Sequence, residues 1–371
     1  MASATLTYHD ERRPDYIIIF CAAFLVAFGI MMLSSASSDL GKTRFGDSYY
    51  YVKHQLLFGL TLGLAGFLVA AKTYYGTYQR VALPLFIISV IGALLIFTPL
   101  GFRAGGAERW INIGPVTIQP AEILKLTLVI YIAAWLGGDA KRRETLWGGL
   151  IPFLAVLGLL GAILLVQSTT SAFVLLAATA GIMYFASGAR LMYLLLTAVL
   201  GIATIVTVSY FSPYRWSRIM AYVNPDANLQ ESGYHSNQAR IAIGSGGLWG
   251  VGLGESTTKM KYLPEPIGDS VFAVIAEELG FVGSATVALL FGTLSLRTLL
   301  LSRRLQNRFG QLLLVGFGTT IGLQAFVNIG AISGLIPLTG MPLPFVSYGG
   351  TGIVVFLTMI GIITNISKYT V

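Results

Sequence analysis

The chain alternates between long apolar blocks and shorter polar segments along most of its length. A membrane-spanning helix needs roughly 20 mostly apolar residues, and ten such blocks can be read from the sequence. They lie at about 16–34, 55–71, 81–98, 121–136, 149–166, 171–187, 191–210, 271–297, 311–335 and 351–367. We therefore predict an all-α polytopic membrane protein with about ten transmembrane helices, in which a large segment, 211–270, joins the seventh helix to the eighth.

The composition leads to the same class of protein. Of 371 residues, 55% are hydrophobic and only 11% are charged, and the mean hydropathy is +0.75. Soluble domains carry roughly 25% charged residues, so a soluble enzyme is excluded, as is a disordered chain. The net charge of +8 comes without a long basic run, which indicates a bias toward one membrane face and not nucleic-acid binding.

The distribution of Lys and Arg predicts the orientation. Ten helices place both termini on one side, and most Lys and Arg residues of the short loops fall on that same side. By the positive-inside rule both termini, including the tail 1–14, are cytoplasmic. The segments 99–120, 211–270 and 336–350 are then extracytoplasmic. Because no internal repeat is found, we expect one integral membrane domain over residues 1–371.

Acidic residues in or beside apolar blocks mark candidate sites, because an ionisable group in a membrane span is expensive. Glu122 and Lys125 are three residues apart, so they share a helical face and can neutralise each other. Two interpretations stay open for this pair, a structural ion pair and a charged wall of a substrate cavity. Glu277 and Glu278 point about 100° apart, so at least one is expected to be paired inside the bundle.

Asp269 directly precedes the eighth apolar block, where the large segment meets a helix start. It could cap that helix, or it could act as a base on an anionic substrate, since basic residues and Glu265 lie nearby in the sequence. The histidines indicate little, because His9, His54 and His235 form no cluster with metal-ligand spacing.

Several segments together resemble one family, the SEDS (shape, elongation, division and sporulation) proteins of the FtsW/RodA/SpoVE group. The matching motifs run in family order along nearly the whole chain. They are Leu33-Ser34-Ser35-Ala36-Ser37, Glu108-Arg109-Trp110-Ile111, Gln119-Pro120-Ala121-Glu122-Ile123-Leu124-Lys125, Asn237 to Gly247, Gly252 to Ser256, Tyr262-Leu263-Pro264-Glu265 through Asp269 to Gly280, and Pro342 to Gly350.

The resemblance implies a ten-helix peptidoglycan glycosyltransferase that polymerises lipid II at the outer face of the bacterial cytoplasmic membrane, for cell division or elongation. It implies Asp269 as the catalytic residue, a divalent cation (Mg²⁺ or Mn²⁺), and a class B penicillin-binding protein of the divisome or elongasome as partner. One carboxylate, Asp269, does not define a metal site. The residues expected to contact substrate are Glu122, Lys125, Arg109, Gln119, Arg215, Arg218, Arg240, Glu265 and Ser347.

The chain departs from the family pattern at two places. Where the family usually has Gln-Pro-Asp, this chain has Gln167-Ser168-Thr169, so a role for that second Asp is missing or moved. Where the family usually has His-Thr before the catalytic Asp, this chain has Ile267-Gly268. The segment Ile275 to Gly280 is slightly more similar to the division branch.

The chemistry that the resemblance implies fits these residues. A sugar carried on a pyrophosphate has a good leaving group, so its transfer needs chiefly one base to deprotonate the attacking hydroxyl. We expect Asp269 to be that base, or to orient the acceptor, with cations offsetting the charge of the departing pyrophosphate. Two other functions remain as alternatives, a transporter that flips lipid II, for which inverted repeats and midplane sites would be expected, and a non-catalytic scaffold.

Overall fold

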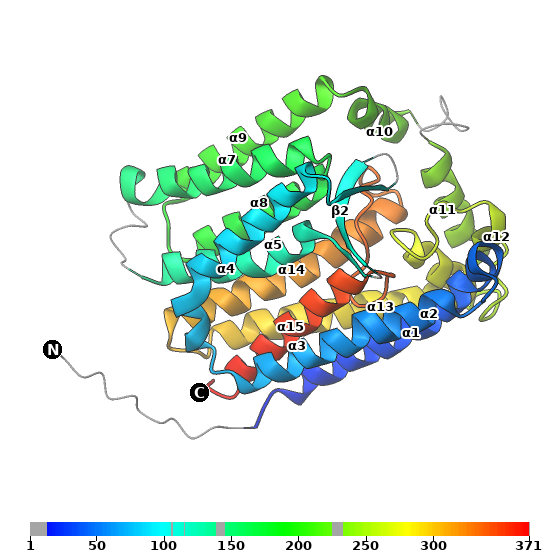
Figure 1. Ribbon diagram of the computed structural model, residues 1–371, viewed down its shortest axis with the longest axis horizontal. Helices are drawn as coiled ribbons and strands as arrows, with labels where there is room; N and C mark the ends of the chain where they lie inside the picture. Colours follow the sequence, from blue (N-terminus) through cyan, green and yellow to red (C-terminus); the bar gives the residue numbers. More distant parts are fainter. Residues whose placement is uncertain (1–12, 105–106, 115, 139–144, 225–232, 371) are drawn as a thin grey trace.

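The computed structural model describes residues 13–104, 107–114, 116–138, 145–224 and 233–370. It is a bundle of long helices (Figure 1). The predicted tail 1–14 lies almost wholly outside the described residues.

Nine described helices are long and apolar enough to cross a membrane. They are α1 (Tyr16–Phe45), the continuous segment Tyr50–Lys72 formed by α2 (Tyr50–His54), η1 (Gln55–Leu60) and α3 (Thr61–Lys72), the segment Gly76–Phe97 that begins with α4 (Gly76–Leu94), α5 (Pro120–Gly137), the segment Leu146–Val166 that ends with α7 (Ile151–Val166), α9 (Leu191–Tyr210), α13 (Val271–Ser302), α14 (Arg308–Ile332) and α15 (Gly350–Ser367). The tenth predicted span is α8 (Thr170–Ala186), an apolar helix of 17 residues. All ten predicted spans are therefore confirmed as helices.

The two ends of the bundle differ. Asp15 caps α1 and lies beside the end of α15, because its backbone N–H donates to Ser367 Oγ at 3.0 Å, and its carboxylate binds Arg297 Nε at 2.8 Å. We call this the terminal end. The opposite end, which we call the loop end, carries the segments 98–119, 211–270 and 333–349 (Figure 1).

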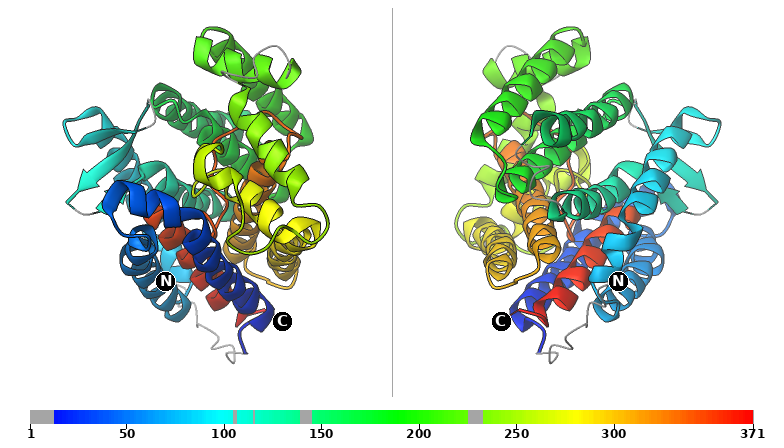
Figure 2. Two further views of the ribbon diagram at one scale, coloured as in Figure 1. Left: turned by 90° about the vertical axis from the view of Figure 1, so that its right-hand side faces the viewer. Right: turned by 90° about the vertical axis from the view of Figure 1, so that its left-hand side faces the viewer.

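The loop end contains structure that the sequence analysis did not predict. The segment 99–120 forms a three-stranded antiparallel sheet of β1 (Gly101–Ala104), β2 (Ala107–Ile113) and β3 (Val116–Ile118), in which Phe102 pairs with Trp110 and Ile111 with Ile118. The predicted all-α class holds for the membrane-spanning helices, and this small sheet is an addition outside them. The sheet lies on one flank of the loop end and the segment around α11 and α12 on the other (Figure 2, left).

The described parts of the segment, 211–224 and 233–270, form three helices, α10 (Pro213–Val223), α11 (Tyr234–Ser245) and α12 (Thr258–Lys261). After α11 the chain turns through a glycine-rich loop, residues 246–254, that packs against α13. Helix α13 is interrupted at Gly280, whose φ is 65°. Val251 and Gly252 donate backbone N–H groups to the carbonyls of Glu277 and Glu278, and Gly247 and Leu248 accept from Phe281 and Val282.

The peptide groups at the interruption of α13 thus form hydrogen bonds with the backbone of the glycine-rich loop, as buried peptide groups require. This contact needs glycine, because a Cβ on Gly246 would lie 1.9 Å from Ala276 O, and one on Gly250 would lie 2.1 Å from Glu278 O. The glycine-rich loop is therefore a backbone partner of a broken helix.

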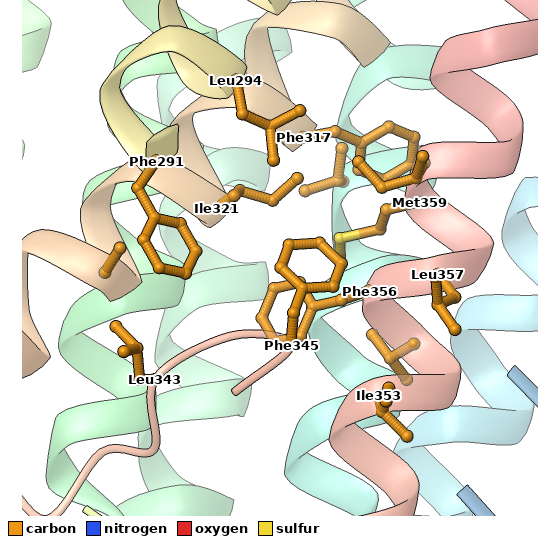
Figure 3. Packing of buried hydrophobic residues seen from close by; sticks show 14 of the residues in the cluster. Phe291, Leu294, Phe317, Ile321, Leu343, Phe345, Ile353, Phe356, Leu357 and Met359 are labelled. Atoms are coloured by element: carbon orange, nitrogen blue, oxygen red, sulfur yellow. The ribbon is translucent and has the colours of Figure 1, made fainter. Parts of the chain in front are cut away.

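One part of the apolar core lies between α13, α14 and α15 and continues into the segment 341–346 (Figure 3). Phe345 lies between Phe291 of α13 and Phe356 of α15, with ring centroids 6.4 and 5.5 Å away. Helix α1 passes this segment closely, because a Cβ on Gly29 would lie 2.6 Å from Phe345 O. This packing fixes the position of the 333–349 segment, against which the candidate site is built.

Candidate functional site

Asp269 lies at the loop end, in the turn that leads into α13. Its side chain is 14% exposed. Asn328 of α14 donates from Nδ2 to the carbonyl of Asp269 at 2.8 Å and to that of Met341 at 2.6 Å. Ser347 donates from Oγ to the carbonyl of Gly268 at 2.6 Å. The backbone of Asp269 is therefore held by side chains from two other parts of the chain.

The Asp269 carboxylate itself is poorly partnered. Its Oδ1 atom is buried and has no hydrogen-bond partner among the described residues. Burial, and then the neighbouring carboxylate of Glu265, raise the pKa of Asp269 to about 7, while Arg218 and the backbone N–H groups of Asp269 and Ser270 oppose the shift. A carboxyl group of this kind exchanges a proton near neutral pH, as a general base must.

Arg218 of α10 and Asp269 approach the same glycine. A Cβ on Gly340 would lie 3.5 Å from Asp269 Oδ2 and 3.7 Å from Arg218 Nη1. Gly340 has a φ of 67°, which a residue with a side chain rarely adopts. Gly340 of the segment 333–349 thus lies beside both Asp269 and Arg218 and presents no side chain to them.

Glu265 shapes the turn before Asp269. It has a φ of 46°, and its carbonyl accepts from the N–H groups of Gly268 at 3.0 Å and Ser270 at 3.2 Å. Its carboxylate acts on the pKa of Asp269. The structure therefore brings Glu265, Arg218, Ser347 and Asp269 together.

The Glu122–Lys125 pair is confirmed and is nearly fully buried. Lys125 Nζ lies 2.5 Å from Glu122 Oε1 and donates to Gln324 Oε1 at 2.7 Å, and Gln324 Nε2 donates to Pro342 O at 2.9 Å. The pair therefore ties α5 to α14 and to the 333–349 segment, which favours the structural interpretation. Glu122 Oε2 is buried without a hydrogen-bond partner among the described residues, so one oxygen stays available.

The other predicted cations do not all converge on Asp269. Arg109 Nη2 donates to Ser168 O at 2.8 Å, and Arg215 Nη2 donates to Leu165 O at 2.7 Å. Both arginines therefore bind the turn between α7 and α8. Arg240 of α11 is exposed and packs on Gly334, where a Cβ would lie 2.5 Å from Arg240 Nε.

Two of the predicted features have mainly structural contacts. Gln119 begins α5 and donates its backbone N–H to Thr351 Oγ1 of α15 at 3.1 Å. At the departure Gln167-Ser168-Thr169, the Gln167 side chain donates from Nε2 to Ala93 O at 2.7 Å and Ser168 has a φ of 57°. The turn that lacks the family's second Asp is thus fixed by other contacts, including the two arginines.

The sequence analysis did not single out three residues beside Asp269, which are Asn328, His235 and Ser270. Asn328 lies inside an apolar block and was not singled out. His235 Nε2 lies 2.6 Å from Ser270 Oγ and 4.0 Å from Asp269 Oδ1, although the sequence places it 34 residues before Asp269. The one available signal was a polar residue, Asn328, in a span; no sequence signal relates His235 to Ser270.

A second carboxylate cluster lies further along α13. Both oxygens of Glu277 accept hydrogen bonds, from Ser256 Oγ at 2.5 Å, from Thr258 Oγ1, and from the N–H groups of Thr257 at 3.1 Å and Thr258 at 3.4 Å. The Glu278 carboxylate binds Lys259 Nζ and Ser35 Oγ, each at 2.6 Å. The expectation that at least one of these glutamates is paired is confirmed for both.

No group of three or more His, Cys, Asp or Glu side chains in the described parts of the chain could hold a metal ion. Asp269 and Glu265 are the acidic side chains of the site, and two carboxylates do not make a protein cage. They do fit the way in which Mg²⁺ is often bound, by one or two carboxylates together with phosphates of the substrate.

Comparison with known proteins identifies the family. Residues 15–371 match the model of the FtsW/RodA/SpoVE cell cycle proteins. The chain is 36% identical to the probable peptidoglycan glycosyltransferase FtsW of Geobacter metallireducens, over 98% of this chain and 96% of that one, and 33% identical to the stage V sporulation protein E of Bacillus subtilis, over 97% and 98%.

Solved structures agree with this result. A structure from work on the coordination of polymerization and crosslinking by a peptidoglycan synthase complex matches with a TM-score of 0.78 and 25% identity, over 96% of this chain and 98% of that one. The rod shape determining protein RodA of Thermus thermophilus matches with a TM-score of 0.70 and 25% identity, over 96% and 97%. Sequence, fold and site together show that the chain belongs to the FtsW/RodA/SpoVE family of cell cycle proteins.

Proposed function

We propose that this chain is a peptidoglycan glycosyltransferase that polymerises lipid II at the outer face of the bacterial cytoplasmic membrane. The observation that carries the proposal is Asp269, a largely buried carboxyl group with a pKa raised to about 7 and one oxygen that no described residue binds. It lies at the loop end, opposite the termini. The positive-inside rule places the termini in the cytoplasm, so the site faces outward. The names of the FtsW relatives support the same activity.

In the proposed reaction Asp269 acts as the general base. Its carboxylate takes the proton of the acceptor sugar hydroxyl as that oxygen bonds to the anomeric carbon of the donor. The bond between that carbon and the pyrophosphate oxygen breaks, and the lipid pyrophosphate leaves with the electron pair. A base with a pKa near the working pH suits this step. Arg218 is the cation best placed to offset negative charge beside Asp269.

A divalent cation, Mg²⁺ or Mn²⁺, would be held by Asp269 and Glu265 together with the phosphates of lipid II. When bound it would offset the charge of the pyrophosphate. Without the ion, Arg218 is the cation that the described residues place beside Asp269. We therefore expect the chain to need added metal for turnover and not for folding.

We further propose a class B penicillin-binding protein as partner, since polymerised strands must be crosslinked. A solved relative comes from a peptidoglycan synthase complex in which polymerization and crosslinking are coordinated. Several relatives are named FtsW, which favours a role in cell division.

The test is lipid II polymerisation by the purified chain with its partner and Mg²⁺ or Mn²⁺. Wild type should produce glycan strands, and Asp269→Asn should not. Asp47→Asn is the matched control, since Asp47 is a carboxylate at the loop end whose side chain is 39% exposed and bound to Lys53. Polymerisation by a folded Asp269→Asn chain would overturn the role of Asp269 as the base. Movement of lipid II between leaflets without any polymer would instead support the alternative function, a transporter.

A further inference from the structure

We propose that His235 is a positioning residue for Asp269 and acts through Ser270. The inference rests on the proposed glycosyltransferase function and adds a residue to its machinery. It starts from a chain of hydrogen bonds. His235 Nε2 lies 2.6 Å from Ser270 Oγ, and Ser270 Oγ donates to Pro264 O at 2.8 Å.

The two hydrogen bonds together determine which atom donates in the contact between His235 and Ser270. A serine hydroxyl has one proton, and Ser270 gives it to the carbonyl of Pro264. Ser270 Oγ must then accept from the imidazole, so His235 carries a proton on Nε2. The order is therefore His235 to Ser270 to Pro264, from α11 across the turn that contains Asp269.

Three consecutive residues of this turn are held by three different side chains. Ser347 binds the carbonyl of Gly268, Asn328 binds the carbonyl of Asp269, and His235 binds the side chain of Ser270. The two residues before Asp269, Ile267 and Gly268, carry no polar side chain of their own. The geometry of the base therefore depends on these outside donors.

His235 differs from the other two donors because it belongs to the long segment 211–270. It is the contact through which α11 reaches the turn. Its ring nitrogen also lies 4.0 Å from Asp269 Oδ1, the oxygen that has no hydrogen-bond partner among the described residues. A displaced imidazole would thus change both the angle of the turn and the surroundings of that oxygen.

The charge state of His235 agrees with a positioning role. Burial, and then Arg218, lower the pKa of His235 to about 4, so the ring is neutral at neutral pH. It does not compete with Asp269 for the proton of the acceptor. The charged groups that act on the two residues are Arg218 from α10 and Glu265 from the turn itself.

The experiment compares His235→Ala, His235→Gln and Ser270→Ala in lipid II polymerisation with the partner and metal present. We expect His235→Ala to lower kcat about 10- to 100-fold, the loss that a misplacement of roughly 1 Å produces, with KM for lipid II within about twofold. His235→Gln should recover most of the rate, because its amide N–H can donate to Ser270 from a similar position. Ile241→Ala is the control, an exposed change on the same helix.

The double variant tests whether His235 acts on Asp269 through Ser270. If His235 acts through Ser270, the rate of His235→Ala/Ser270→Ala should equal that of the worse single variant and not the product of the two losses. Unchanged kcat in His235→Ala, an effect on KM alone, fully additive losses, or failure of His235→Gln to recover activity would each overturn the inference. If wild type made no glycan, the proposed function would fall first and the inference with it.

Discussion

Asp269 and Glu277 are two carboxylates eight residues apart on one stretch of chain, and both are largely buried. Glu277 accepts from two hydroxyl and two backbone N–H donors. Asp269 has one oxygen without a partner among the described residues. Both side chains are largely buried, so the two differ in the donors and charges that surround them.

The difference has a physical origin in what surrounds each group. Glu277 lies beside the loop 254–258, where successive residues present hydroxyl and N–H groups to it. Asp269 lies beside Gly340 and Gly268, which present no side chain, and beside another carboxylate, Glu265. The donors around Glu277 hold that side chain in place, whereas burial and the carboxylate of Glu265 raise the pKa of Asp269.

The largest expected effect separates rate from stability. Asp269→Asn should lower kcat by about 10²- to 10⁴-fold, as removal of a general base does, with no loss of folding stability, because the variant removes a buried charge. Glu277→Gln should instead lower the free energy of unfolding by about 1–3 kcal/mol, since a carboxamide leaves donors without an acceptor. Lipid II polymerisation and thermal unfolding in detergent measure the two effects. Equal loss of stability in both variants would remove the distinction.

The next effect concerns the ion pair between Lys259 and Glu278. Lys259→Met leaves the carboxylate of Glu278 buried without its cation, so we expect a loss of about 3–5 kcal/mol in the free energy of unfolding. The double variant Lys259→Met/Glu278→Leu should be less destabilised than the single one, because no lone charge remains. Thermal or chemical unfolding in detergent checks this order. A double variant as unstable as the single one would show that packing, and not charge, holds this cluster.

A smaller effect tests the glycine-rich loop, residues 246–254, that packs against α13. A Cβ on Gly246 would lie 1.9 Å from Ala276 O, so Gly246→Ala should lower the free energy of unfolding by about 1–3 kcal/mol through overpacking. Gly244→Ala is the matched control two residues earlier, since a Cβ there meets nothing within 4 Å. Equal melting temperatures for the two variants would contradict the close contact between the loop and α13.

The smallest effect is the pH dependence that Asp269 predicts. Because its pKa is raised to about 7, the active ionised form is lost below neutral pH, and kcat should fall about tenfold for each pH unit below that point. The same shift means that protonated Asp269 favours the folded state, and this contribution is lost as the pH rises through about 7. Glu265→Gln removes a like charge and should move the midpoint of the rate profile to lower pH. An unmoved midpoint would show that burial alone sets the pKa.

The sequence by itself determined the ten helices and the importance of particular charged residues. In a bilayer every peptide group must be satisfied within the segment, so about 20 apolar residues predict a helix whatever its neighbours are. The same reasoning singles out Glu122, Lys125 and Asp269, because a charge at such a place requires a partner or a function. The resemblance to the family then supplied the expected role of Asp269.

Only the tertiary structure decided which groups meet. His235 and Ser270 lie 35 residues apart, Asn328 lies 59 residues beyond Asp269, and no periodicity along the chain relates them. The sheet at 101–118 and the pairing of the glycine loop with the broken α13 were also not predicted. The physical reason is that side-chain and backbone hydrogen bonds between distant segments depend on how helices pack, whereas the formation of each helix depends on its own apolar residues.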